Sequence, residues 1–307
     1  MFRESARRLG ALTVSTVAAL VLTACGSEGG TTDEQALVFA AVPSEESTSL
    51  QTKYEPIIAM LEQETGRKIT FQNATDYAAV IEGQRAGKIH FAQYGPFSYV
   101  LAKNAGVDAT PLGAFVEAPG DEPGYQSYAI TKAGSSVTSL ADVRGKSVCF
   151  VDPASTSGYL YPTAGLLAAG VDPKNDITAV MSGGHDASVL AVMSGQCEVG
   201  FAYDTMVDEV LISKGELAAG DVTVVWKSEV IPGSPLAVSG ELEPVLLETI
   251  TKAIHEKGNV DYLLANGFCS DPCDIGEEGR WGYTPVDDAL YDGVRKVCET
   301  TKDEKCQ

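Results

Sequence analysis

Asp152-Pro153-Ala154-Ser155-Thr156-Ser157-Gly158 is the stretch around which the whole chain can be organised. It directly follows residues 147–151, an apolar and β-branched run that is typical of a buried strand. Proline cannot continue a central strand, and the pattern over 159–169 predicts a helix that stops at Gly170. Three consecutive hydroxyl residues in this stretch therefore stand where a helix begins.

A helix start attracts anions, because its first backbone N–H groups lack intrahelical partners and carry a partial positive charge. Together with these N–H groups, the side chains of Ser155, Thr156 and Ser157 form an uncharged set of donors suited to a tetrahedral oxyanion. A plain N-cap is the alternative interpretation, because Ser and Thr favour that position in any helix. One cap needs only one hydroxyl, so three in a row favour a binding site.

The first 24 residues are predicted to be a secretory signal peptide. Three arginines precede the apolar stretch 9–22, which runs into Leu22-Thr23-Ala24-Cys25-Gly26. A cysteine at the cleavage point resembles the bacterial lipobox, so we expect Cys25 to be lipidated and 25–35 to form a polar tether. The apolar stretch is too short to favour a transmembrane helix. We therefore expect a lipid-anchored protein on the extracytoplasmic face of the cell membrane.

The chain has 307 residues, enough for two domains, and a formal net charge of −20. Removal of the signal peptide takes away three arginines and one glutamate and makes the charge −22. Such an acidic protein is a poor candidate for nucleic-acid binding, which needs a basic surface. It also repels anions, so an anion site must depend on local donors.

Six cysteines remain after Cys25, an even number that predicts three disulfides in an oxidising compartment. Cys269–Cys273 would close a tight loop and Cys298–Cys306 would hold the C-terminal tail. Cys149 and Cys197 are then left to pair with each other. A zinc site at Cys269 and Cys273 is disfavoured because no second pair accompanies them. We expect no metal and no cofactor.

Apolar strand patterns alternate with helical patterns along most of the chain, which predicts α/β lobes with mainly parallel sheets flanked by helices. A long strand over 125–131 and the turn 231–236 have no helix partner and are expected to cross between two lobes. We place 36–126 and 232–307 in the first lobe and 127–231 in the second. The C-terminal part from 243 should be helical and pack on the first lobe.

Ligands of open α/β sheets bind at the carboxyl ends of the strands. The turns 43–47, Tyr94, Gly184-His185-Asp186 and Tyr203-Asp204 all follow predicted strands and should meet the 152–158 stretch in the cleft. For Asp204, the sequence leaves two roles open, a cap for the next helix or a ligand contact.

These segments resemble the phosphonate/phosphite/phosphate-binding lipoproteins of ABC importers. The matching segments are Asp76-Tyr77-Ala78 with Glu82-Gly83, Tyr94-Gly95, the 152–158 stretch, Gly184-His185-Asp186 with Ala191-Val192, and Ile231-Pro232-Gly233. The resemblance implies a two-lobed type II periplasmic-binding-protein fold with two crossover strands. It also implies a monomer that binds a small phosphorus oxyanion and delivers it to an importer permease.

The same resemblance implies roles for individual residues. Ser155, Thr156 and Ser157 would bind the phosphonate oxygens, Tyr94 and His185 would complete the donors, and Tyr77 would line the pocket. Two other functions stay open at this point. One is a hydrolase with Ser155 or Ser157 as nucleophile and His185 as base, although a Gly-x-Ser-x-Gly elbow is missing. The other is a binding protein for an organosulfonate or a thiamine precursor.

The turn at 232–235 bears on which substituent the phosphorus atom of the ligand carries. Family members that take aminoalkyl phosphonates present acidic residues to the ammonium, one of them in a Pro-Gly-Asp-Pro turn, where this chain has Pro232-Gly233-Ser234-Pro235. Since a buried ammonium needs a partner, we expect phosphite or methylphosphonate to be preferred to 2-aminoethylphosphonate. Phosphate should bind less well if apolar side chains face its fourth oxygen.

Overall fold

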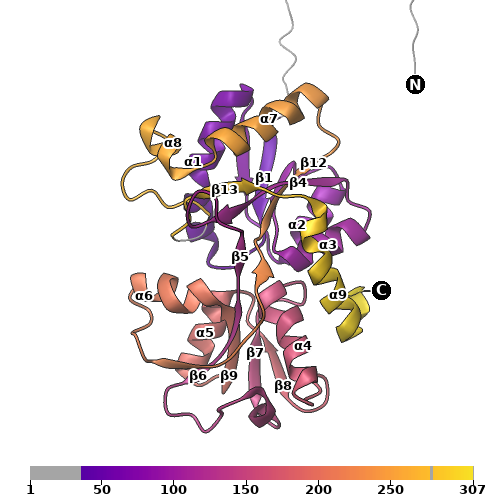
Figure 1. Ribbon diagram of the computed structural model, residues 1–307, viewed down its shortest axis with the longest axis vertical. Coiled ribbons are helices and arrows are strands. Elements are labelled where there is room, and N and C mark those ends of the chain that lie inside the picture. The colour runs from indigo at the N-terminus through magenta and orange to yellow at the C-terminus, as the bar shows by residue number, and fades with distance from the viewer. Residues whose placement is uncertain (1–35, 277–278, 307) are drawn as a thin grey trace, which may run out of the picture. The chain divides into compact units, whose positions relative to one another are not determined.

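The computed structural model describes residues 36–276 and 279–306. The predicted signal peptide, the lipidated Cys25 and the tether lie outside the described residues. Two sheets, each flanked by helices, make up the described part of the chain (Figure 1). We call the elements around the six-stranded sheet the first lobe and those around the five-stranded sheet the second lobe.

The sheet of the first lobe has the strand order β13-β4-β12-β3-β1-β2. Its strands are β1 (Leu37–Ala41), β2 (Ile69–Gln72), β3 (Phe91–Gln93), β4 (Ala109–Val116), β12 (Pro235–Ser239) and β13 (Gly282–Pro285). Its helices are α1 (Ser47–Thr65), α2 (Tyr77–Arg85), α3 (Pro96–Asn104), α7 (Pro244–Lys257) and α8 (Val260–Ala265). Both faces are covered, because Phe39 of β1 packs with α1 and α7 while the next residue, Ala40, packs with α2 and α3.

The sheet of the second lobe has the order β10-β6-β9-β7-β8. Its strands are β6 (Ser127–Lys132), β7 (Ser147–Phe150), β8 (Thr178–Met181), β9 (Val199–Tyr203) and β10 (Val222–Lys227). Its helical segments are the 3-10 turn Leu140–Val143, the π-helical turns Thr156–Leu160 and Met206–Val210, and the α-helices α4 (Tyr161–Ala168), α5 (His185–Ser194) and α6 (Leu211–Ser213). On β7, Phe150 packs against α4 and Cys149 against α5, so this sheet is also buried on both faces.

Two short strands connect the lobes: β5 (Gly124–Tyr125) pairs antiparallel with β11 (Ile231–Pro232). The sheets are mixed, which departs from the expectation of mainly parallel ones. The groups β2-β1-β3 and β9-β7-β8 are parallel, whereas β12, β4, β13, β6 and β10 pair antiparallel with their neighbours. The strands that come directly from a crossing, β6 and β12, enter their sheets in the reverse direction and so introduce antiparallel pairing.

The C-terminal segment comprises the 3-10 turn Asp288–Tyr291, α9 (Asp292–Thr301) and the 3-10 turn Glu304–Cys306. It does not pack on the first lobe alone, because α9 contacts both α3 and α4 and lies beside both lobes in Figure 1. The Tyr159 hydroxyl of the second lobe donates a hydrogen bond to Asp303 Oδ2 at 2.8 Å. The C-terminal tail is therefore a further connection between the lobes.

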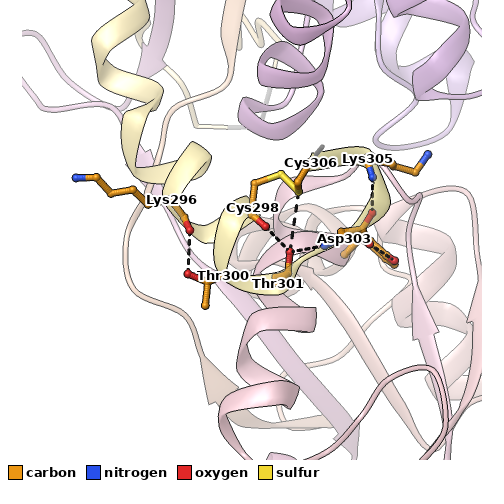
Figure 2. Close-up of a disulfide and its surroundings, with 8 residues drawn as sticks. Lys296, Cys298, Thr300, Thr301, Asp303, Lys305 and Cys306 are labelled. Atoms are coloured by element: carbon orange, nitrogen blue, oxygen red, sulfur yellow. Dashed lines mark hydrogen bonds between the residues drawn. A yellow bond between two sulfur atoms is a disulfide. The ribbon is translucent and has the colours of Figure 1, made fainter.

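The three predicted cysteine pairs lie at bonding distance, with Cα–Cα separations of 5.8 Å for Cys149–Cys197, 5.6 Å for Cys269–Cys273 and 5.5 Å for Cys298–Cys306. Figure 2 shows the last pair at the end of α9, where the Thr301 hydroxyl donates to the Cys298 carbonyl at 2.8 Å. Oxidation of these pairs in the exported protein stays a prediction.

Over residues 36–276 and 279–306, no helix is long and apolar enough to cross a membrane. Nor do three or more His, Cys, Asp or Glu side chains in these ranges come together in a way that could hold a metal ion.

Candidate anion-binding site

A small cavity of about 40 Å³ lies between the lobes. A buried water needs about 10–15 Å³ of cavity volume, so the cavity has room for roughly three waters or one small tetrahedral ion. The first lobe and the β11–β12 turn contribute Ala41, Val42, Ser44, Tyr54, Tyr77, Gln93, Tyr94, Gly95, Ser234 and Gly276. The second lobe and the crossing contribute Tyr125, Ser155, Thr156, Ser157, His185 and Tyr203. None of these sixteen lining residues is an acid, a lysine or an arginine.

The hydroxyl triplet begins a π-helical turn, not the α-helix that the sequence predicted. The Leu160 N–H donates to the Ser155 carbonyl at 3.0 Å, five residues back, and α4 starts only at Tyr161. Two carbonyls of the turn bond elsewhere: Ser157 O accepts from Ser127 Oγ at 2.6 Å, and Gly158 O accepts from the Val151 N–H at 3.1 Å. Single π-turns of this kind are frequent at functional sites.

Two of the three triplet hydroxyls accept a hydrogen bond from a backbone N–H and keep their own hydrogen. Ser155 Oγ accepts from the Gly158 N–H at 3.0 Å, and Thr156 Oγ1 accepts from the Phe97 N–H of the first lobe at 2.8 Å. A hydroxyl whose oxygen accepts still has its own hydrogen to donate. The Ser157 hydroxyl makes no hydrogen bond to any residue that the structure describes, although Ser157 is only 2% exposed. All three can therefore donate into the cavity.

His185 is the first residue of α5 and is neutral. Burial lowers the pKa of its imidazole to about 3. The Tyr203 N–H donates to Nδ1 at 3.2 Å, so the single ring proton sits on Nε2, 3.4 Å from Ser155 Oγ. The imidazole thus lines the cavity as a neutral ring whose single hydrogen makes only a long hydrogen bond, to Ser155 Oγ.

Tyr77 and Tyr94 both line the cavity, but Tyr94 differs from its expected role of donor. The Tyr94 hydroxyl donates to Gln84 Oε1 at 2.9 Å, so its hydrogen is already used within the first lobe. Tyr77 is buried, and burial, followed by the nearby Asp152 charge, raises the pKa of its phenol. Tyr94 is also buried, which raises its pKa as well, so both phenols stay protonated.

Asp204 does not line the cavity. Its carboxylate accepts from the Gln126 N–H at 2.9 Å and from the Thr205 N–H at 3.0 Å. The side chain thus holds the start of β6 against the end of β9. These bonds favour the structural role over the ligand contact.

Several lining residues were not singled out from the sequence, although some lie in turns that were expected at the cleft. Gln93 ends β3, and its amide is committed: Nε2 donates to Ser234 O at 3.0 Å and Oε1 accepts from the Tyr283 hydroxyl at 2.9 Å. Ser234 lies in the Pro-Gly-Ser-Pro turn, and Tyr125 lies on the first crossing strand. The sequence signal that could have identified these lining residues was their position at strand ends and at the crossings between the lobes.

Two lobes, two crossing strands and a small cavity lined by neutral donors define an extracytoplasmic solute-binding protein. Residues 39–262 match the family model described as "ABC transporter, phosphonate, periplasmic substrate-binding protein", and the chain belongs to this family. It is 46% identical over 310 residues to the Phosphate-import protein PhnD of Mycolicibacterium smegmatis, across 96% of this chain and 97% of that protein. These relatives are binding proteins and not enzymes, so the hydrolase alternative is set aside.

Solved structures agree with this assignment. A binding protein component of an ABC phosphonate transporter from Pseudomonas aeruginosa superposes with a TM-score of 0.76 at 26% identity, covering 88% of this chain and 87% of that chain. PhnD1 from Prochlorococcus marinus, solved in complex with methylphosphonate, has a TM-score of 0.72 at 16% identity, covering 87% and 98%. The second comparison supports the fold alone.

Gly158→Ala should lower the free energy of unfolding by about 1–3 kcal/mol, as overpacking of a dense core does. A Cβ at this position would lie 2.3 Å from Val151 Cγ2 and 2.8 Å from Ser155 Oγ. Urea denaturation measures the effect. Gly293→Ala is the control, because no atom beyond its chain neighbours and the nearby backbone of its own helix lies within 4 Å of a Cβ there. Equal stability of the two variants would contradict the described packing of the turn.

Proposed function

We propose that this protein captures inorganic phosphate, or a phosphorus oxyanion of the same size, and delivers it to the permease of an ABC importer. One observation carries the proposal: a cavity with room for a single small tetrahedral ion lies between the lobes and is lined by neutral polar groups, with a cluster of donors on the second lobe. The proposed ligand donors are the hydroxyls of Ser155, Thr156 and Ser157, the Nε2–H of His185 and the first backbone N–H groups of the turn.

These donors are sufficient for useful affinity. Hydrogen bonds to a charged group contribute about 1.5–3 kcal/mol each. Five or six of them can offset the desolvation of a small dianion, which costs several kcal/mol after relaxation. A micromolar dissociation constant requires a net of about 8 kcal/mol. A cationic side chain is therefore not needed.

The polar lining of the cavity favours phosphate over phosphite and methylphosphonate. The expectation that phosphate binds poorly depended on apolar side chains around its fourth oxygen. Among the described lining residues, aliphatic side chains come only from Ala41 and Val42, and most of the others carry hydroxyl, amide or imidazole groups. A protonated fourth oxygen can therefore find hydrogen-bond partners. The name of the Mycolicibacterium smegmatis relative, a phosphate-import protein, supports the same choice.

Titration calorimetry with phosphate, phosphite, methylphosphonate, 2-aminoethylphosphonate and methanesulfonate tests the ligand. We expect phosphate to bind with a micromolar or lower dissociation constant. 2-Aminoethylphosphonate should bind at least about tenfold more weakly than methylphosphonate, because none of the lining residues that the structure describes offers a carboxylate to its ammonium. The order of the five dissociation constants is the readout.

Two outcomes would count against this proposal. Tighter binding of methanesulfonate than of every phosphorus compound would move the protein to the organosulfonate binders. Binding of 2-aminoethylphosphonate as tight as that of methylphosphonate would show that an acid reaches the ligand, and the proposed uncharged substituent site would be wrong.

Ser157→Ala should weaken phosphate binding by about 1.5 kcal/mol or more, roughly tenfold, because it removes one donor to a charged group. The fold should survive, since the Ser157 hydroxyl holds no other described residue in place. Ser136→Ala, in an exposed loop of the same lobe, is the matched control and should bind like the parent protein. An unchanged dissociation constant for Ser157→Ala would place the anion elsewhere.

The membrane anchor belongs to this proposal as well. We expect Cys25→Ala to move the protein from the membrane fraction to the soluble extracytoplasmic fraction, because the acyl chains can no longer be attached. Ser27→Ala, two residues away, should leave the distribution unchanged. Fractionation followed by immunoblotting decides the matter. Retention of Cys25→Ala in the membrane through an uncleaved N-terminus would refute the lipobox.

A further inference from the structure

Three consecutive residues between β1 and α1 bond to the second lobe. The Ser44 carbonyl accepts from the His185 N–H at 2.8 Å. Glu45 Oε2 accepts from Lys214 Nζ at 2.9 Å, and the Glu46 N–H donates to Asp186 Oδ2 at 3.1 Å. This segment, 44–46, therefore joins the lobes beside the cavity, next to the proposed ligand donor His185.

Glu45 is the centre of these contacts and is almost fully buried, with 1% of its side chain exposed. It has two ammonium partners: Lys53 Nζ at 2.8 Å from Oε1 and Lys214 Nζ at 2.9 Å from Oε2. The Ser49 hydroxyl adds a third hydrogen bond at 3.1 Å. Burial by itself would raise the pKa of Glu45, but the two lysines outweigh it and the pKa lies below its ordinary value.

The two lysines belong to different lobes. Lys53 is on α1, in the same lobe as Glu45, whereas Lys214 directly follows α6 in the second lobe. If the lobes separate, Glu45 keeps Lys53 and is not left as an unpaired buried charge, which would be very costly. Lys214, with 28% of its side chain exposed, can move into water. The Glu45–Lys214 ion pair is thus the part of the cluster that exists only while the lobes are in contact.

Lys214 does not line the cavity, and it lies in an outer groove together with Glu46, Lys53 and Asp186. We propose that Lys214 is a positioning residue that sets the residence time of the bound anion by holding the lobes together through Glu45. The inference rests on the proposed function of the cavity. Its mechanism is indirect: the same segment that binds Lys214 also holds the His185 N–H. Separation at Glu45 therefore frees the start of α5, which carries the proposed donor His185, and takes the first-lobe lining away from the ligand.

The test compares release of radiolabelled phosphate from the full chain, chased with excess unlabelled phosphate. Lys214→Met should release phosphate about tenfold faster than the parent protein, with an association rate within about twofold, because loss of a buried pair acts mainly on dissociation. Lys214→Arg should restore slow release, since a guanidinium can also bind Glu45. Lys146→Met is the charge-matched control, because Lys146 pairs with Glu198 inside the second lobe.

A purely structural role would have different signatures. It would lower the thermal midpoint of the phosphate-free Lys214→Met protein below that of Lys146→Met. The proposal instead expects the two variants to have the same thermal midpoint without phosphate. Release from Lys214→Met at the parent rate, or equally fast release from Lys146→Met, would overturn the proposal.

A readout without ligand separates the two proposals. Amide exchange at His185 and Glu46 in the phosphate-free chain should be faster in Lys214→Met than in Lys146→Met. Equal exchange would refute the role of Lys214 even if phosphate binds. Faster exchange without any phosphate binding to the parent protein would refute only the proposed ligand.

Discussion

Among residues 36–276 and 279–306, the lining of this cavity offers an anion no cationic side chain, so the charge has to be balanced by the hydrogens of neutral donors. The structure meets this constraint through the placement of its acceptors. The side-chain oxygens of Ser155 and Thr156 and the Nδ1 atom of His185 are each occupied by a backbone N–H group. Because these lone pairs are used within the protein, the hydroxyl hydrogens are left for the cavity, and the Nε2 hydrogen of His185 is engaged only by the long 3.4 Å contact with Ser155 Oγ. Unprotonated phosphorus oxygens offer only acceptors, and this arrangement suits them.

The π-helical turn makes that placement possible. In an α-helix, the Gly158 carbonyl would bind the N–H of residue 162, but residue 162 is proline and has none. The carbonyl accepts from Val151 instead, and that of Ser157 accepts from Ser127. Two tertiary bonds thus hold the binding segment against the sheet before any ligand arrives. Such preorganisation reduces the entropy that binding must overcome.

Part of the fold and part of the binding site could be predicted from local sequence patterns. The strand at 147–151, the break at Pro153 and the hydroxyl triplet are all read within a few neighbouring residues. Strands β4, β12 and β13 were missed because Pro111, Pro235 and Pro285 argue against strands. They are tolerated since they lie at an irregularity in the β4–β12 pairing, at the first residue of β12 and at the end of the edge strand β13. The acceptor for Tyr94, on the separate helix α2, depends on tertiary packing and leaves no local pattern.

The neutrality of the site also bears on release. Coulomb attraction to a cation would persist to about 8 Å at physiological salt, whereas a hydrogen bond is lost once its geometry is disturbed. The chain carries a net charge of −20, so its field opposes an anion that has left the donors. Thr156 bonds to Phe97 and His185 to Ser44 across the lobes, which ties the donor geometry to lobe contact. Separation of the lobes therefore removes the short-range attraction and leaves a repulsive field. This favours transfer of the anion to the permease over rebinding to the cavity.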